Sequence, residues 1–324
     1  MAWNSHELRS AKTIPAGDEE RHSPFCHSRR QRHRTRRRHP VVGRFAIAAS
    51  ARSCQTIGVS ASVHDTEQAP LIATAGWAVP KDLRARCPDT GTLLQRYAAL
   101  LGATEINSTF YRRHRVSTFE RWRESVPDTF RFAVKLPRSI THESALAAPR
   151  QELDSFFQDV RGLGYKLGPV LVQLPASVPF ETRRVTHFFR LLRERHAGLV
   201  ACEPRHASWY HERVTELFLE HDVARVLADP PRPPQAATLL EGTSLAYVRW
   251  HGSPRIYWSA YGDEQLSTLA SIVRARAART VWCVFDNTAA GAALHDALRF
   301  RDLSSALRSR AFKSTLGRET GENG

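Results

Sequence analysis

The chain has 324 residues, 42% of them hydrophobic, and its 47 lysines and arginines outnumber 32 acidic residues, which gives a formal net charge of +15. No apolar stretch approaches the roughly 18 residues that span a bilayer, and the N-terminus lacks the apolar segment of a signal peptide, so we expect a cytoplasmic protein without membrane contact. The five cysteines are scattered, with no C-x-x-C pair, which indicates reduced thiols.

Residues 1–66 carry much of the basic excess and show no sustained period of a helix or a strand, so we expect a disordered, arginine-rich tail. Seven arginines lie between Arg29 and Arg38 alone. Such a run can bind a nucleic-acid backbone through charge, but a solvated tail is the simpler interpretation, and we do not expect nucleic acid to be the primary partner. An organellar transit peptide fits the arginine and serine content, although the acidic residues 18–20 count against it.

From Pro70 onward, short apolar runs alternate with longer segments of helical period, which predicts alternating strands and helices. The eight predicted strands are 71–75, 103–106, 130–134, 170–174, 199–203, 223–228, 245–250 and 280–285. Helices are expected near 90–101, 117–125, 150–163, 182–195, 212–220, 264–277 and 289–307, whereas the proline-rich residues 230–234 resist a helix.

Eight strands with mostly helical connections over about 240 residues are typical of a single (β/α)8 barrel of the TIM type. Continuous apolar strands also fit buried parallel pairing. An open doubly wound sheet is the alternative, but residues 75–77 after the first strand do not form the glycine-rich phosphate loop of such folds. We therefore predict an α/β barrel domain at 67–310, between the tail at 1–66 and a flexible C-terminal tail at 311–324.

Polar side chains gather at the carboxyl ends of the predicted strands, and their amino ends offer nothing comparable. In barrel enzymes the carboxyl-end face carries the chemistry, so we predict a ligand site there. The alternative is scattered polarity that water and caps satisfy. The polar residues at these strand ends are Glu105, Asn107, Lys135, Gln173, Glu203, Arg205, Asp229, Arg249, His251, Asp286 and Asn287.

Several ordered motifs resemble the YecE-like family, also called domain of unknown function 72. The resemblance covers about residues 71–308 and implies a TIM barrel whose activity is not established. The chain departs from the family at 73–79, where members commonly carry a Gly-Thr-Ser-Gly-Trp run with further aromatics, so any ligand contact of those aromatics is missing here. The motifs are Glu105-Ile-Asn-Ser-Thr-Phe-Tyr111, Phe132-Ala-Val-Lys-Leu-Pro-Arg138, Ile140-Thr-His142, Lys166-Leu-Gly-Pro-Val-Leu-Val-Gln-Leu-Pro175, Glu203-Pro-Arg-His206, Arg249-Trp-His-Gly252 and Phe285-Asp-Asn-Thr288.

The residue types at the strand ends predict acid/base chemistry on a small polar ligand, either sugar-like or phosphorylated. Glu203 is the expected general base, because neighbouring cations keep it ionised. Lys135, His251 and Asp286 complete the predicted catalytic set. The predicted substrate-binding residues are Glu105, Asn107, Tyr111, His142, Gln173, Arg205, His206, Trp209, Asp229, Arg249, Tyr257 and Asn287.

Lys135 has two interpretations. An ion pair with Glu105 or Glu203 is the favoured one, and a Schiff-base nucleophile is the other. A divalent metal could use Glu203, Asp229, His251 and Asp286, but no local signature such as H-E-x-x-H supports it, and no glycine run cradles a nucleotide, so we predict neither metal nor cofactor.

Three function classes stay open. The first is a metal-independent hydrolase, lyase or isomerase that uses acid/base catalysis. The second is a metal-dependent nucleic-acid-processing enzyme, which would bind with a strong salt dependence. The third is a non-catalytic ligand-binding barrel. Metal analysis of the purified protein separates the first two, and a ligand that binds without turnover would favour the third.

The tail is expected to be dispensable for folding, because the strand and helix pattern begins only near residue 70. A truncated chain that starts at Glu67 should keep the melting temperature of the full chain within a few degrees. Calorimetry of both proteins measures this, and a large loss of stability would place the domain boundary earlier in the chain.

Overall fold

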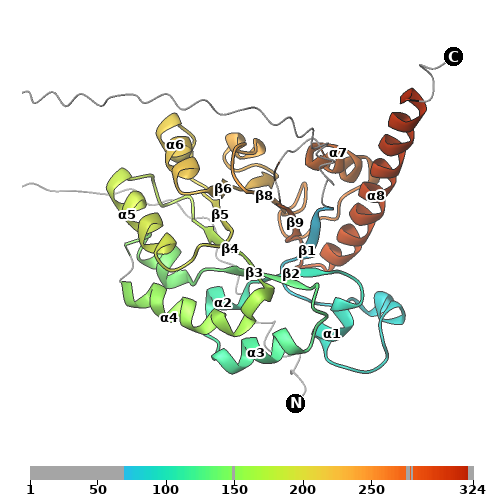
Figure 1. The fold of residues 1–324 in the computed structure, drawn as a ribbon, viewed down its shortest axis with the longest axis horizontal. Helices are drawn as coiled ribbons and strands as arrows, with labels where there is room; N and C mark the ends of the chain where they lie inside the picture. The colour runs from blue at the N-terminus through green and yellow to red at the C-terminus, as the bar shows by residue number, and fades with distance from the viewer. Residues whose placement is uncertain (1–68, 148–149, 275–277, 279, 320–324) are drawn as a thin grey trace, which may run out of the picture. The chain divides into compact units, whose positions relative to one another are not determined.

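The structure is a computed structural model that describes residues 69–147, 150–274, 278 and 280–319 (Figure 1). The predicted N-terminal tail at 1–66 lies outside the described residues, as do residues 320–324.

Every strand pair in the described part of the chain is parallel. The strands form two sheets, with the orders β2-β3-β4-β5-β6 and β1-β9-β8-β7. Their bounds are β1 Leu71–Thr74, β2 Ala103–Ile106, β3 Arg131–Lys135, β4 Leu167–Gln173, β5 Val200–Glu203, β6 Val223–Arg225, β7 Leu227–Asp229, β8 Leu245–Trp250 and β9 Thr280–Phe285.

The single strand expected at 223–228 is two short strands in the structure, and they belong to different sheets. β6 pairs with β5, whereas β7 pairs with β8. Between them, the Val226 N–H donates to the Cys202 carbonyl of β5 at 2.9 Å. The chain therefore stays hydrogen-bonded to β5 where it passes from one sheet to the other. The strand is divided because its two halves have different partners.

The two sheets also meet at β1 and β2. Ala75 and Glu105 form an isolated parallel bridge, and the Gly76 N–H donates to the Glu105 carbonyl at 2.8 Å. The sequence predicts one closed sheet, and the structure has two parallel sheets in contact at both ends of their strand orders. The fold is therefore α/β with parallel sheets.

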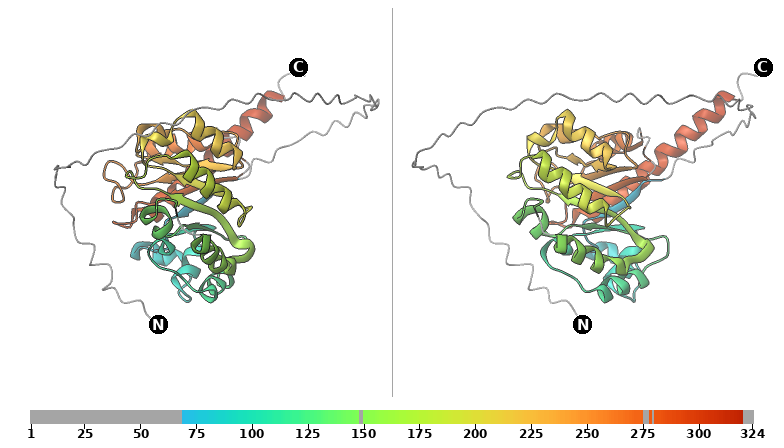
Figure 2. Two further views of the ribbon diagram at one scale, coloured as in Figure 1. Left: turned by 90° about the vertical axis from the view of Figure 1, so that its left-hand side faces the viewer. Right: turned by 60° about the vertical axis from the view of Figure 1, so that its left-hand side comes forward.

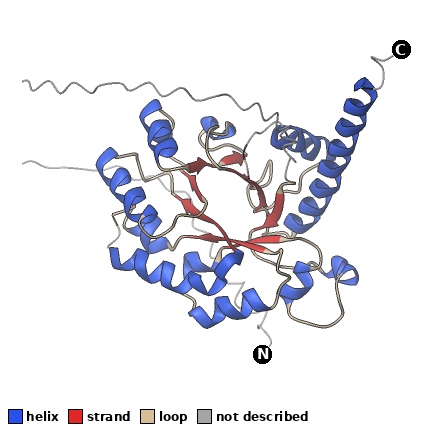
Figure 3. Cartoon of the chain, in the orientation of Figure 1, coloured by secondary structure: helices blue, strands red, loops and turns tan. Residues whose placement is uncertain are grey.

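The helices lie outside the strands, which surround a common centre in Figure 3. Among the described residues, no helix is both long and apolar enough to cross a membrane. The last helix, α8, continues through 311–319, part of the segment expected as a C-terminal tail, and its end projects away from the strands in Figure 2. The helix bounds are α1 Leu93–Ala98, α2 Ser108–Tyr111, α3 Val116–Glu124, α4 Arg150–Val160, α5 Thr182–Arg193, α6 Glu212–Glu220, α7 Asp263–Arg274 and α8 Ala292–Glu319.

A cluster of buried residues from the strands and the β6–β7 junction, without any helix residue, fills the space between the sheets. Five of its eleven buried members are small alanines, which leave room for the Tyr247 and Trp282 rings to stack with centroids 6.2 Å apart and planes 12° apart. Side chains two positions further along a strand point the same way. A polar residue therefore follows this layer towards the carboxyl end on each of five strands: Glu105, Lys135, Gln173, Glu203 and Arg249.

Gly168 in β4 makes this packing testable. A Cβ at Gly168 would meet Trp282 Cζ2 at 2.7 Å, and Trp282 is buried against Tyr247. We expect Gly168→Ala to lower the free energy of unfolding by about 1–3 kcal/mol through overpacking, measured by urea denaturation. Gly102→Ala is the matched control, since a Cβ there meets nothing within 4 Å. Equal stabilities of the two variants would contradict this packing.

Candidate functional site

Arg249 in β8 is the centre of a buried charge network at the carboxyl ends of the strands. Its Nη1 donates to Glu203 Oε2 at 2.6 Å, and its Nη2 donates to Glu105 Oε1 at 2.8 Å and to Asp286 Oδ2 at 2.9 Å. The Arg249 side chain is 1% exposed. One guanidinium thus binds three carboxylates that come from β2, β5 and the end of β9, and such charge-assisted hydrogen bonds are among the strongest in proteins.

The second oxygen of Glu203 is also engaged. Arg205 donates to Glu203 Oε1 from Nε at 2.9 Å and from Nη2 at 2.8 Å, and its Nη2 also donates to the Tyr257 hydroxyl at 3.1 Å. Burial tends to raise the pKa of Glu203, but the charges of Arg249 and Arg205 hold that pKa well below its usual range. An efficient general base has a pKa near the working pH. Glu203 therefore binds two arginines, and its lowered pKa argues against the expected role as general base.

His251 forms a pair with Asp286 beside this network. His251 Nδ1 lies 3.0 Å from Asp286 Oδ2. Burial tends to raise the pKa of Asp286, but Arg249 and His251 lower it overall, so the carboxylate is ionised and Nδ1 must be the donor. His251 Nε2 is buried, has no hydrogen-bond partner among the described residues, and lies 3.4 Å from Glu203 Oε1.

The charge state of His251 follows from two opposing effects. Burial tends to lower the pKa of His251, whereas Glu203 and Asp286 raise it, and the net pKa lies above the usual value for histidine. His251 is therefore protonated over a wider pH range than an ordinary histidine. A histidine that a carboxylate orients through Nδ1, with Nε2 left for a ligand, has the arrangement of a proton-transfer group.

A cavity of about 260 Å³ opens beside Glu203 and His251. Three of its lining residues, Arg205, Arg232 and His251, carry or can carry positive charge. Arg232 is exposed and forms no ion pair with a residue that the structure describes. The cavity therefore combines a proton-transfer group with cations that suit a small anionic ligand. Its lining residues are Glu203, Arg205, Ala228, Pro230, Arg232, His251, Ile256 and Tyr257.

Lys135, at the end of β3, does not form the expected ion pair with Glu105 or Glu203. Within the described residues, no carboxylate oxygen lies within 4.0 Å of its amine, and Nζ lies 4.2 Å from the centre of the Phe110 ring. Burial, followed by repulsion from Arg249, lowers the pKa of Lys135 to about 8. Instead, Arg249 binds one oxygen of Glu105 and one of Glu203, while Tyr247 and Arg205 bind the other two.

His142 also contacts Phe110, from the helical turn Ser139–Glu143. Its ring meets the Phe110 ring edge-on, with centroids 4.8 Å apart. Burial, together with the positive charges of Lys135, Arg138 and Arg205, lowers the pKa of His142 to about 4. His142 is therefore neutral near pH 7 and lies within electrostatic reach of both Lys135 and Arg205.

Several residues that were predicted to contact a ligand make hydrogen bonds within the fold instead. Trp209 is fully buried in the hydrophobic core and donates its indole N–H to the Val178 carbonyl at 3.0 Å, so it is unavailable to a ligand. Three more of these residues form hydrogen bonds to nearby residues, which the pattern of polar strand ends could not predict. Gln173 donates to the Leu174 carbonyl at 3.0 Å, His206 Nδ1 accepts from the Ser208 N–H at 3.1 Å, and Asn287 donates to Asp296 Oδ2 at 2.6 Å.

Three predicted residues lie apart from the network for different reasons. Asp229 Oδ2 accepts from the Tyr261 hydroxyl at 2.7 Å. Asn107 precedes α2, and its buried Oδ1 has no partner among the described residues. Tyr111 is 79% exposed and lines a different cavity.

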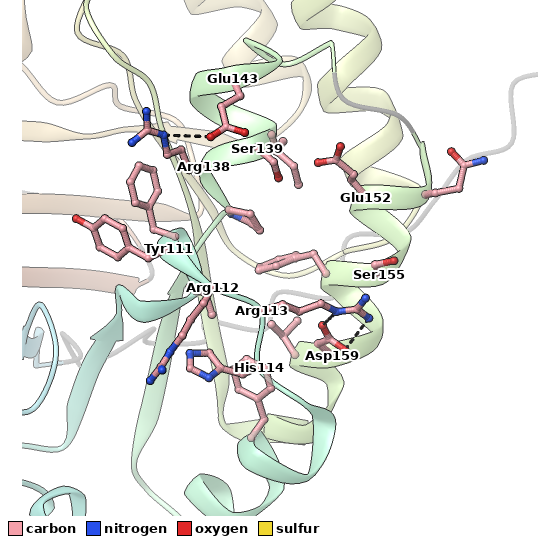
Figure 4. Close-up of a pocket in the computed structure, with 18 residues that line it drawn as sticks. Tyr111, Arg112, Arg113, His114, Arg138, Ser139, Glu143, Glu152, Ser155 and Asp159 are labelled. Atoms are coloured by element: carbon pink, nitrogen blue, oxygen red, sulfur yellow. Dashed lines mark hydrogen bonds and ion pairs between the residues drawn. The ribbon is translucent and has the colours of Figure 1, made fainter. Parts of the chain in front are cut away.

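That second cavity, of about 710 Å³, lies between α2, the turn Ser139–Glu143 and α4 (Figure 4). It contains no member of the Arg249 network. Two pairs of its charged residues bind one another, Arg138 with Glu143 at 3.2 Å and Arg113 Nη2 with Asp159 Oδ1 at 3.0 Å. The smaller cavity is the better candidate for chemistry, since it combines the His251–Asp286 pair with Arg205 and with Arg232, which has no ion pair to a described residue.

The sequence interpretation missed two residues of the site. Tyr247 is fully buried and donates its hydroxyl to Glu105 Oε2 at 2.7 Å. Its position two residues before Arg249, on the same strand face, is a signal that could have found it. Arg232 lines the cavity but lies in a proline-rich connection without any period, so no comparable signal marks it.

Comparison with known proteins gives a family model and several relatives. The model described as protein of unknown function DUF72 matches residues 71–319. The UPF0759 protein YecE of Escherichia coli K12 is 32% identical over 168 residues, which are 50% of this chain and 59% of that protein. The same protein from Escherichia coli O157:H7 is 33% identical over 113 residues, or 35% of this chain and 40% of the relative. The chain thus spans only about half the length of these curated relatives.

Two solved structures of DUF72 proteins share the fold. The Thermotoga maritima MSB8 protein has a TM-score of 0.60 and 26% identity, over 72% of this chain and 99% of that one. The Enterococcus faecalis V583 protein has a TM-score of 0.62 and 20% identity, over 72% of this chain and 94% of that one.

The stability of the network depends on Arg249. We expect Arg249→Met to lower the free energy of unfolding by about 3–5 kcal/mol at pH 7, because three carboxylates are left without their shared partner. Denaturant unfolding measures the loss. Arg183→Met, at an exposed arginine of α5, is the matched control and should change stability by less than about 0.5 kcal/mol. Similar losses in both variants would contradict the central role of Arg249.

The same variant should change the pH dependence of stability. In the native network, the pKa values of Glu203 and Asp286 are lowered, so their contribution is present above the unfolded value near 4 and is lost as the pH falls through the lower folded values. Without Arg249, burial acts with less opposition and raises both pKa values. We expect Arg249→Met to lose less stability than the native chain between about pH 5 and 3. An unchanged pH profile would argue against the network.

Proposed function

The chain belongs to the DUF72 family, whose function is unknown, and we propose that it is an enzyme that transfers protons on a small anionic ligand at the carboxyl ends of its strands. In this proposal the two sheets act as one (β/α)8 barrel of the TIM type, because β6 leads directly into β7 and β1 bridges to β2. A cytoplasmic location is part of the proposal.

The pair of Asp286 and His251 carries the proposal. Asp286 orients the imidazole through Nδ1. Nε2 lies 3.4 Å from Glu203 Oε1, makes no hydrogen bond to a described residue, and lies beside a cavity that a ligand can enter. Because the pKa of His251 is raised, the ring acts as a general acid near neutral pH and as a base once it has given up its proton. Glu203 holds Arg205 and Arg249 in place around it.

The ligand is proposed to be a sugar-like or phosphorylated small molecule. A cavity of about 260 Å³ accommodates a compact ligand, and Arg205 and Arg232 can bind its phosphate or carboxylate group. The Tyr257 hydroxyl, which accepts from Arg205, adds a polar group to the lining of the same cavity.

The alternatives fit the described residues less well. A metal-dependent nucleic-acid enzyme needs carboxylates free to bind the ion, and Arg249 lies between the three that the site offers. No group of three or more histidine, cysteine or acidic side chains in the described part of the chain is placed to hold a metal ion. A non-catalytic binding barrel would use the same cavity, and turnover separates it from an enzyme.

Proton NMR in D₂O tests the proposal whatever the product of the reaction is. The full chain is incubated with a panel of sugar phosphates, hydroxy acids and keto acids, and both deuterium exchange at carbon and new products are recorded. We expect turnover of a panel compound, and we expect His251→Gln to lower kcat by about 10²–10⁴-fold. His187→Gln, at an exposed histidine of α5, is the control and should keep the native rate.

Two results would overturn the proposal. Panel compounds that bind, as saturation-transfer NMR detects, without exchange or product would favour a binding protein. Turnover that survives in a folded His251→Gln variant would remove His251 from the chemistry.

A further inference from the structure

The buried Lys166 and the half-buried Lys135 have opposite surroundings. Lys166 donates from Nζ to the Arg123 and Val126 carbonyls at 2.8 and 2.7 Å, and it pairs with Asp128 at 3.4 Å. Lys135 has neither a hydrogen bond from Nζ nor an ion pair with any residue that the structure describes. A buried ammonium without partners is costly, so Lys166 is a structural cation and Lys135 is not.

The surroundings of Lys135 favour a free amine. Its Nζ lies over the Phe110 ring, and the nearby carboxylates of Glu105, Glu203 and Asp286 are bound by Arg249. A lysine that is desolvated beside another cation loses its proton more easily and becomes nucleophilic. The lowered pKa of Lys135, about 8, agrees with this environment.

Lys135 ends β3 on the same side of the fold as Glu203, which ends β5 and binds Arg205. The charges of Lys135 and Arg205 both act on His142, so both cations lie within electrostatic reach of one half-buried imidazole. Because that imidazole is neutral, it adds no charge to repel either of them. A ligand with a reactive carbon and an anionic group can therefore approach the amine while Arg205 holds its charge.

We propose that Lys135 forms an imine with a substrate aldehyde or ketone whose phosphate or carboxylate group is bound by Arg205. This inference rests on the proposed function, and it names carbonyl compounds as the substrate class of the same site.

The step balances without a redox partner. The Lys135 nitrogen lone pair forms a bond to the carbonyl carbon, and the carbon–oxygen π pair moves to oxygen. The nitrogen then loses its two protons, the oxygen leaves as water, and a C=N bond replaces the C=O bond. The protonated imine withdraws electrons from the adjacent carbon, where His251 can then move a proton.

Borohydride trapping tests the inference, with pyridoxal 5′-phosphate as an aldehyde that carries a phosphate. The chain has only five lysines, Lys12, Lys81, Lys135, Lys166 and Lys313, so peptide mass spectrometry assigns each reduced adduct to one position. We expect Lys135 to be labelled about tenfold or more faster than the exposed Lys81 at pH 7.5, with a rate that reaches half its maximum near pH 8, and Lys166 to stay unlabelled. Labelling of Lys135 no faster than that of Lys81 would overturn the proposal.

Two further experiments test the roles of Lys135 and of Arg205 separately. Pyridoxal, which lacks the phosphate, should label Lys135 more slowly than pyridoxal 5′-phosphate does, and Arg205→Gln should remove that difference. Lys135→Arg keeps a cation at the end of β3, so it should remain folded by circular dichroism and lose the adduct. An adduct rate that ignores both the phosphate and Arg205 would overturn the assignment of Arg205.

The imine and the proposed function can fail separately. Turnover that depends on His251 without trapping of Lys135 would leave the proposed function standing and overturn the imine. Selective trapping of Lys135 in a chain that turns over no panel compound would support the imine and argue against the proposed function.

Discussion

The Arg249 guanidinium and the three carboxylates around it are the constraint on which the rest of the site depends. Removing three carboxylates from water is costly, and only a partner with several fixed donors can offset that cost in one place. Arginine has this fork of donors, whereas lysine offers a point charge. Because the carboxylates come from β2, β5 and β9, the same hydrogen bonds tie the two sheets together at their carboxyl ends.

The network also determines what is left for chemistry. Arg249 and Arg205 occupy both oxygens of Glu203, so this carboxylate is held ionised and is no longer a good base. The groups without a full set of partners are His251, through Nε2, and Lys135, through its amine. Titratable groups with perturbed pKa values beside a cavity are candidates for function. Burial and then Arg249 lower the pKa of Lys135, whereas Glu203 and Asp286 raise the pKa of His251 against the effect of burial.

The sequence predicted the parallel strands and the polar strand ends well, because both follow from local patterns. A strand period of two places Glu105, Glu203 and Arg249 on the inner face with no further information. The lack of a carboxylate partner at Lys135 could not be predicted in this way, since the pairing of the three carboxylates depends on distances across the fold. The structural role of Trp209 could not be predicted for a related reason, because its hydrogen bond to Val178 joins segments that are 31 residues apart.

The charge of the site links anion binding to proton uptake. The carboxylates of Glu105, Glu203 and Asp286 exceed the guanidiniums of Arg249 and Arg205 by one negative charge, and protonation of Lys135 and His251 turns this into one positive charge. An anionic ligand therefore binds best when both are protonated, and by linkage its binding raises their affinity for protons. A ligand held by Arg205 would thus keep His251 charged as a proton donor. Imine formation has the opposite requirement at Lys135, which must lose its proton to attack, so an anionic carbonyl compound should react faster as the pH rises towards about 8.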